Sequence, residues 1–171
     1  MNELDKFQIE LLTNFERTLQ KLIRDRYRKN SAGQAEFVAL IEKFIKILSV
    51  DPRPRPPLGH LEPWPKGTSR DGWELWKLKF PMPKISSGAA RKGRLIYLIN
   101  CVEKNIGFIW IYTHAEFEKR PPDKKLKDLL EEFIKSSEDL DKNHQLSEDI
   151  VSETQEEELE EPKEKKPVSE S

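Results

Sequence analysis

Two runs of β-branched and aromatic residues, separated by a short polar turn, constrain the fold of this chain more than any other feature. The runs span residues 94–101 and 106–113, and the turn between them contains Glu103, Lys104 and Asn105. Such residues favour strands, and two runs joined by a few polar residues are typical of a β-hairpin. We therefore predict an antiparallel β-hairpin over these two segments.

A further strand precedes the predicted hairpin. Residues 73–80 alternate in polarity, so that Trp76 and Leu78 lie on one face and Lys77 and Lys79 on the other. Alternation with a period of two residues is typical of a strand that is buried on one face. We expect the second face of this strand to be basic.

Three segments have the apolar spacing of amphipathic helices. The first runs from Leu4 to about Tyr27, the second begins at Ser31, and the third runs from Asp123 to about residue 135. Ser31 and Gln34 have the form of a capping box. The order helix, helix, strands, helix predicts an α+β fold with an N-terminal helical hairpin packed on a small antiparallel β-sheet and a C-terminal helix.

Charge divides the chain at about residue 135. Residues 136–171 contain 13 acidic and 4 basic residues, which leaves 26 basic and 18 acidic residues in 1–135. We predict one basic domain over 1–135, with a proline-rich loop at 51–72, followed by a disordered acidic tail over 136–171. A basic domain favours polyanions such as nucleic acid. The tail is either a solvated terminus or a segment that folds back over the basic sheet.

Several classes of protein are disfavoured by composition. Cys101 is the single cysteine and no signal peptide is apparent, so we expect a cytoplasmic protein without an intramolecular disulfide. No apolar run approaches the roughly 18–20 residues of a membrane helix, so we expect no membrane partner. The three histidines and one cysteine are dispersed, and known nucleotide-binding and hydrolase motifs are absent. We therefore expect no metal site and no cofactor.

Cationic and titratable side chains are concentrated on and after the predicted strands. Lys and Arg pair with phosphates and stabilise the extra charge of a phosphoryl transition state, whereas His and Tyr can transfer protons. These residues are therefore candidates for a polyanion-binding site. The candidates are Lys77, Lys79, Lys84, Arg91, Lys92, Arg94, Tyr112, His114, Lys119 and Arg120.

The same residues also have structural interpretations. Lysines such as Lys77 and Lys79 can protect a sheet edge from aggregation. Arg94 can simply flank a strand, and His114 can be a surface residue of a loop. Basic residues at the end of the first helix interact favourably with the helix dipole, which accounts for several of them without any function. Spacing alone does not decide between these interpretations.

Three segments, which follow two predicted helices, resemble sequences of the RelE/ParE toxin superfamily. They are Trp73-Glu74-Leu75-Trp76-Lys77-Leu78, the segment 87–97 with its run Arg94-Leu95-Ile96-Tyr97, and Trp110-Ile111-Tyr112-Thr113-His114. The resemblance covers about residues 1–135. It implies the fold of that superfamily and a toxin of a type II toxin–antitoxin system.

The resemblance also implies an activity and its residues. The activity is cleavage of mRNA, in which the ribose 2′-hydroxyl of the substrate attacks the adjacent phosphate without a metal ion. By position, Arg94 would bind the scissile phosphate, Lys79 or Arg91 would stabilise the developing charge, and Tyr112 and His114 would transfer protons. The other cations of the cluster described above are then expected to bind the RNA, namely Lys77, Lys84, Lys92, Lys119 and Arg120.

The implied partners are a cognate antitoxin, mRNA and, if cleavage depends on it, the ribosome.

A second interpretation is a ParE-like or catalytically degenerate module that binds protein or nucleic acid without cleavage. It is favoured by Lys79, which stands where many active relatives carry arginine, because lysine cannot form the bidentate pair of a guanidinium.

Overall fold

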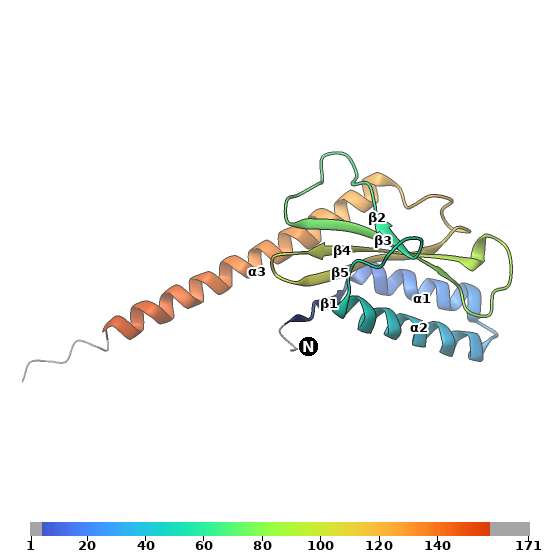
Figure 1. Cartoon of the computed structure of the whole chain (residues 1–171), viewed down its shortest axis with the longest axis horizontal. Coiled ribbons are helices and arrows are strands. Elements are labelled where there is room, and N and C mark those ends of the chain that lie inside the picture. Colours follow the sequence, from blue (N-terminus) through green and yellow to red (C-terminus); the bar gives the residue numbers. More distant parts are fainter. Residues whose placement is uncertain (1–4, 158–171) are drawn as a thin grey trace, which may run out of the picture. The chain divides into compact units, whose positions relative to one another are not determined.

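The computed structural model describes residues 5–157, and these form an α+β fold with three helices and a five-stranded sheet (Figure 1). The chain divides into two units, Met1–Glu132 and Phe133–Ser171, and the sheet belongs to the first. The elements in chain order are β1 (Gln8–Leu11), α1 (Thr13–Tyr27), α2 (Ser31–Val50), β2 (Gly59–Leu61), β3 (Trp73–Pro81), the 3-10 turn η2 (Ala89–Arg91), β4 (Lys92–Asn100), β5 (Asn105–Thr113) and α3 (Asp123–Glu157).

The predicted hairpin and the strand before it form the middle of the sheet. The strand order is β1-β5-β4-β3-β2, and β3, β4 and β5 pair antiparallel along their lengths. Lys79 on β3 lies opposite Arg94 on β4, and Arg94 lies opposite Tyr112 on β5. Because cross-strand partners share a face of the sheet, these three side chains lie on the same side.

The first strand was not predicted, and the sheet is mixed rather than antiparallel. Residues 8–11 were expected in a helix, but they form β1, which pairs parallel with the edge of β5. This pairing satisfies backbone groups that β5 would otherwise expose, and Gln8 N–H donates to the carbonyl of Lys104 at 2.9 Å. The alternation of Ile9 and Leu11 with polar neighbours fits a strand as well as a helix.

The second helix begins as predicted, but with a different cap. The side chain of Asn30 accepts a hydrogen bond from Gly33 N–H at 2.9 Å, whereas Ser31 is the first helical residue. Asparagine is as good an N-cap as serine, so the cap is Asn30, one residue before the predicted Ser31. The helix ends at Val50, immediately before the proline-rich segment.

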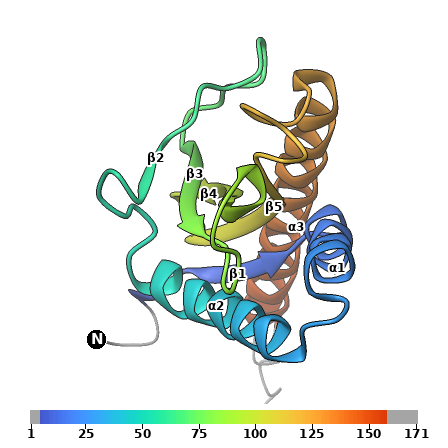
Figure 2. The ribbon, with the colours of Figure 1, turned by 90° about the vertical axis from the view of Figure 1, so that its right-hand side faces the viewer.

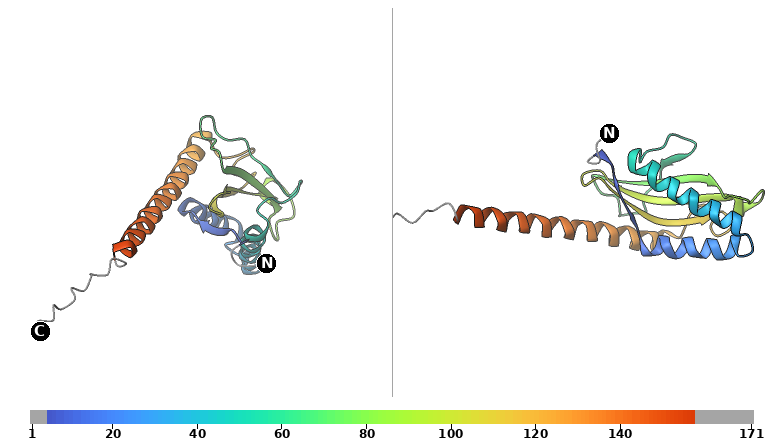
Figure 3. Two further views of the ribbon diagram at one scale, coloured as in Figure 1. Left: turned by 60° about the vertical axis from the view of Figure 1, so that its left-hand side comes forward. Right: turned by 90° about the horizontal axis from the view of Figure 1, so that it is seen from below.

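Helices α1 and α2 cover one face of the sheet, and Figures 1 and 2 show both on the same side. Figure 3 shows α1 following β1 directly and α2 running back beside α1. As predicted, the apolar face of β3 points into the core between this helical layer and the sheet. The core side chains include Phe15, Leu22, Phe37, Leu48, Trp76, Leu78, Leu95, Tyr97 and Phe108.

The proline-rich segment 51–72 is not a loop throughout, because it contains β2, which pairs antiparallel with β3. Two contacts attach the segment to the sheet. The hydroxyl of Tyr97 donates to the carbonyl of Pro52 at 2.8 Å, and Arg53 Nη2 donates to the Glu74 carboxylate at 2.6 Å. These contacts fix the start of the segment and therefore the position of β2.

The last helix is longer than predicted. It runs to Glu157, so residues 136–157 are helical where a disordered tail was expected, and residues 158–171 lie outside the described part. No proline or glycine occurs between Asp123 and Glu157, and Glu, Lys and Leu favour helix. An i,i+4 contact between His144 and Glu148 also fits this helix. Within residues 5–157, no helix has the length and apolar character needed to cross a membrane.

We expect Glu74→Gln to destabilise the protein by about 1–2 kcal/mol at pH 7, allowing for the partial exposure of this carboxylate. Hydrogen bonds from Arg53, Cys101 and Trp76 lower the pKa of Glu74 from 4.5 to about 2. The stabilisation is therefore complete above about pH 4.5 and is lost as the pH falls through 2. Urea denaturation at pH 7 and at pH 2.5 measures this difference.

The matched control for that experiment is Glu103→Gln, because Glu103 is exposed in the β4–β5 turn. Its free energy of unfolding should stay close to that of the wild type at both pH values. An equal effect of the two substitutions would contradict the assigned role of Glu74.

Candidate functional site

A cationic cleft lies on the face of the sheet opposite α1 and α2. Strands β3 and β4 form its floor, β2 and the residues after it form one wall, and the loop between β5 and α3 forms the other. The cleft has a volume of about 690 Å³. Six of the predicted site residues line it, namely Lys77, Lys79, Arg94, His114, Lys119 and Arg120.

Two cations on the floor of the cleft have no carboxylate partner among residues 5–157. They are Lys79 and Arg94, which face each other across β3 and β4. Arg94 is half-buried and donates one hydrogen bond, at 2.7 Å, to the carbonyl of Gly93. Burial lowers the pKa of Arg94, but an arginine stays charged at neutral pH. The pair is therefore available to an anion from solution.

His114 lies just after β5, beside these cations. Its backbone N–H donates to the carbonyl of Lys92 at 3.1 Å, which continues the pairing of β5 with β4. Burial lowers the pKa of His114, and the positive charges of Arg94, Lys92 and Lys77 lower it further, while Glu118 opposes them. The imidazole is thus neutral at pH 7, and a neutral imidazole can accept a proton.

Glu62 organises the other half of the cleft. Its side chain is only 5% exposed, and its carboxylate lies 3.0 Å from Lys77 Nζ, 3.4 Å from Arg120 Nη1 and 3.2 Å from His60 Nε2. A buried carboxylate is stable only with such partners. The positive charges of Lys77 and Arg120 are therefore largely neutralised inside the protein.

Neither Glu62 nor His60 was among the predicted site residues. Both come from β2 and the residue after it, within a segment expected to be loop. The backbone N–H of Glu62 donates to the carbonyl of Leu75 at 2.8 Å, which extends the pairing of β2 with β3 and brings both side chains to the cleft. Their local sequence has no motif that signals this placement.

The remaining predicted residues lie at varying distances from the cleft. Arg91 and Lys92 line an adjoining hollow that shares Lys79 and Arg94 with the cleft. Lys84 lies elsewhere, on the connection after β3, where it pairs with Glu36 of α2 at 3.4 Å. The structure thus places Arg91 and Lys92 in a hollow that adjoins the cleft but does not bring Lys84 to the cleft.

Tyr112 is buried beside the cleft rather than exposed within it. Its side chain is 1% exposed, and its hydroxyl donates to the carbonyl of Lys119 at 2.9 Å. Burial raises the pKa of Tyr112, so the phenol stays protonated at neutral pH. In this structure the hydroxyl helps to hold the loop that carries Lys119.

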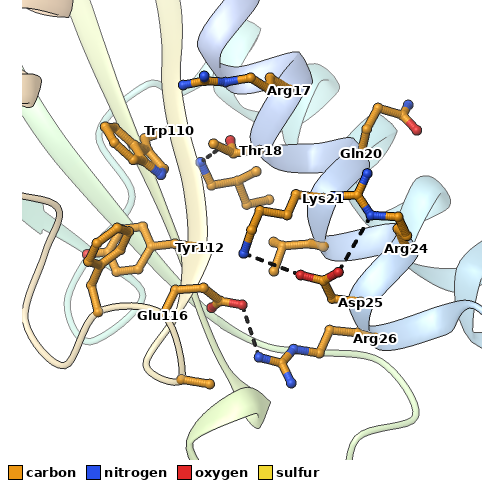
Figure 4. Close-up of a pocket in the computed structure, with 14 residues that line it drawn as sticks. Arg17, Thr18, Gln20, Lys21, Arg24, Asp25, Arg26, Trp110, Tyr112 and Glu116 are labelled. Atoms are coloured by element: carbon orange, nitrogen blue, oxygen red, sulfur yellow. Dashed lines mark hydrogen bonds and ion pairs between the residues drawn. The ribbon is translucent and has the colours of Figure 1, made fainter.

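A second pocket, of about 740 Å³, lies between α1 and β5 (Figure 4). Its charged side chains are largely paired with one another. Lys21 and Arg24 contact Asp25, and Arg26 donates to Glu116 at 3.0 Å. Although this pocket is slightly larger, its titratable groups already neutralise each other, so we regard the cationic cleft as the candidate functional site.

No group of three or more His, Cys, Asp or Glu side chains in the described residues is arranged to hold a metal ion. The side chains that line the cleft have a chemistry of their own. Cations can bind an anion on the floor, and imidazoles can transfer protons at its sides.

Comparison with known proteins gives similarity at the level of structure. No family model matches the sequence, and no curated protein matches it. The chain is similar to a structure of the archaeal RelE–RelB complex from Pyrococcus horikoshii OT3, with 16% identity and a TM-score of 0.40 over 64% of this chain and 97% of that chain. It is also similar to a mutant of the E. coli toxin RelE in the free state, with 14% identity and a TM-score of 0.35 over 66% of this chain and 88% of that chain.

Proposed function

We propose that this protein is a RelE-like toxin that cleaves RNA without a metal ion, by attack of the ribose 2′-hydroxyl on the adjacent phosphate. The observation that carries the proposal is the cationic cleft, where Lys79 and Arg94 lack carboxylate partners within residues 5–157 and His114 lines the same space. Arg94 is half-buried, and a cation in a partly buried site binds a phosphate more strongly than an exposed one, while the exposed Lys79 adds a second positive charge beside it.

In this reaction the scissile phosphate binds to Lys79 and Arg94. The transition state carries more negative charge on phosphorus oxygens than the ground state does, so the two cations stabilise it preferentially. Neutral His114 accepts the proton of the 2′-hydroxyl. The products are an RNA with a 2′,3′-cyclic phosphate and an RNA with a 5′-hydroxyl.

The adjoining hollow gives the RNA a path beyond the scissile phosphate. Arg91 and Lys92 lie there, next to the two cations of the cleft floor. A row of cations of this kind binds successive phosphates without reading their sequence. We propose mRNA as the substrate and a cognate antitoxin as the protein partner, as the sequence resemblance implies.

The test is a cleavage assay with the purified full-length protein on RNA oligonucleotides of mixed sequence, in EDTA and with or without ribosomes. We expect cleavage that persists in EDTA, leaves 2′,3′-cyclic phosphate ends and is absent when every ribose is replaced by deoxyribose. Expression of the protein should arrest growth, and co-expression of the antitoxin should suppress both effects. Intact RNA in every condition would overturn the proposal.

A second candidate function is RNA binding without cleavage. It is favoured by the buried hydroxyl of Tyr112, which already donates to Lys119 and so is not free to transfer a proton. The same assay separates the two functions. A protein that only binds retards the RNA on a native gel and leaves it intact.

A further inference from the structure

We propose that His60, held by Glu62, is the second proton-transfer residue of the cationic cleft and protonates the leaving 5′-oxygen while His114 acts as the base. This inference rests on the proposed endoribonuclease function and adds a residue that the sequence resemblance does not assign. It follows from the topology of the sheet and from the contacts of Glu62.

Cleavage by the 2′-hydroxyl requires two proton transfers on opposite sides of the phosphate. The O2′–H bond breaks as O2′ bonds to phosphorus, and the P–O5′ bond breaks with its electron pair left on O5′. Because the attacking and leaving oxygens lie in line, the base that takes the first proton cannot also reach O5′. A complete site therefore needs a second group across the phosphate from the first.

The sheet places the two imidazoles in this relation. His60 lies on β2, opposite Lys77 of β3, and His114 follows β5. The strand order puts β3 and β4, with Lys79 and Arg94, between them. A phosphate bound to those cations therefore lies between the two strands that bring the histidines to the cleft.

Other groups of the cleft are less suited to give a proton. Lys77 and Arg120 are both engaged by Glu62, and lysine and arginine are much weaker acids than an imidazolium. Tyr112 is buried and donates elsewhere. Among the described residues that line the cleft, His60 and His114 are the two whose ordinary pKa is near neutrality.

Glu62 acts on His60 as a positioning residue. Its Oε2 lies 3.2 Å from His60 Nε2, so the protonated Nε2 donates to Glu62 and Nδ1 is the nitrogen left to serve the substrate. A carboxylate in this position orients the ring and stabilises the imidazolium. Cations lie near both rings, but only His60 is seen in an ion pair with a carboxylate among the described residues that line the cleft, so we assign the acid role to His60 and the base role to His114.

The pH dependence of the rate follows from the surroundings of both rings. Burial lowers the pKa of His60, Glu62 raises it in part, and Lys79 and Lys77 lower it. The acid must be protonated and the base neutral, so the rate should fall above the pKa of His60 and below that of His114. Because both values lie below 6.5, we expect a bell-shaped profile with its maximum on the acid side of neutrality.

The experiment compares two substrates at the linkage that the wild-type protein cleaves. One has the natural 5′-oxygen, and the other has sulfur in its place, because a thiolate leaves without being protonated. We expect His60→Ala to cleave the oxygen substrate about 100- to 10,000-fold more slowly and the sulfur substrate at nearly the wild-type rate. His114→Ala should be slow on both substrates.

Two further measurements keep the result interpretable. His144→Ala is the matched control, since His144 is exposed on α3, and it should cleave both substrates like the wild type. Binding of His60→Ala to the all-deoxy oligonucleotide shows that the variant is folded. Equal loss on both substrates by His60→Ala, or no loss on either, would overturn the role of His60 while leaving the endoribonuclease function intact. Failure of the wild type to cleave either substrate would overturn both.

Discussion

Replacing Arg94 with alanine should slow RNA cleavage by about 100- to 1,000-fold, the usual effect of removing one charge-stabilising donor from an active site. Arg94 is half-buried on the floor of the cleft, and no carboxylate within the described part of the chain pairs with it. Its charge is therefore available to a phosphate that binds in the cleft, as we propose. Single-turnover cleavage at a fixed pH measures the loss, and relief of growth arrest should accompany it.

Two other variants define what Arg94 contributes. Arg94→Lys keeps the charge but loses the bidentate geometry, so its rate should lie between those of the wild type and Arg94→Ala. Arg24→Ala is the matched control, because Arg24 is exposed on α1 and contacts Asp25. An Arg94→Ala protein that is folded, cleaves RNA at the wild-type rate and remains toxic would refute the assignment of the phosphate site to this residue.

The middle of the sheet could be predicted because its local pattern and its tertiary environment agree. Alternation in β3 sends Lys77 and Lys79 to one face and Trp76 to the core, as the structure confirms. The apolar runs at 94–101 and 106–113 are rich in β-branched and aromatic residues, which favour strand over helix. Where local preference and the fold agree in this way, sequence patterns are sufficient.

The first strand and the far wall of the cleft could not be predicted, because long-range partners decide them. Residues 8–11 are ambiguous alone and become β1 only because β5 presents a free edge. Glu62 reaches the cleft because β2 pairs with β3 and because Arg53 and Glu74 hold the preceding segment. Neither the pairing of β1 with β5 nor that of β2 with β3 is indicated by the local sequence of the short strands.

This difference explains which part of the candidate site was found from the sequence. Lys79, Arg94 and His114 lie on or next to strands with clear patterns, so they were candidates from the sequence, and the strand register then shows that Lys79 and Arg94 share a face. His60 and Glu62 lie in a segment whose prolines predict only a break in the preceding helix. The sequence therefore indicated the basic side chains of the cleft, including Lys77 and Arg120, but not the carboxylate and the histidine that lie among them.

We expect Glu62→Ala to destabilise the protein by about 3 kcal/mol, near the lower end of the range for breaking a buried ion pair. The substitution leaves Lys77 and Arg120, which are 12% and 17% exposed, without this carboxylate. Their remaining exposure lets water compensate in part, which is why the lower value applies. Urea denaturation at pH 7, followed by circular dichroism, measures the change.

The origin of that loss can be tested with a second substitution. Arg120 keeps its pair with Asp123, so if the unpaired charge of Lys77 causes the loss, Lys77→Met in the Glu62→Ala background should restore part of the stability. The substitution replaces a buried charge by an apolar side chain of similar length. Asp25→Ala, which removes an exposed carboxylate from a pair with Lys21, should have a much smaller effect than Glu62→Ala. Equal effects of the two alanine substitutions, or further destabilisation by Lys77→Met, would contradict the view that Glu62 stabilises the protein by pairing with buried cations.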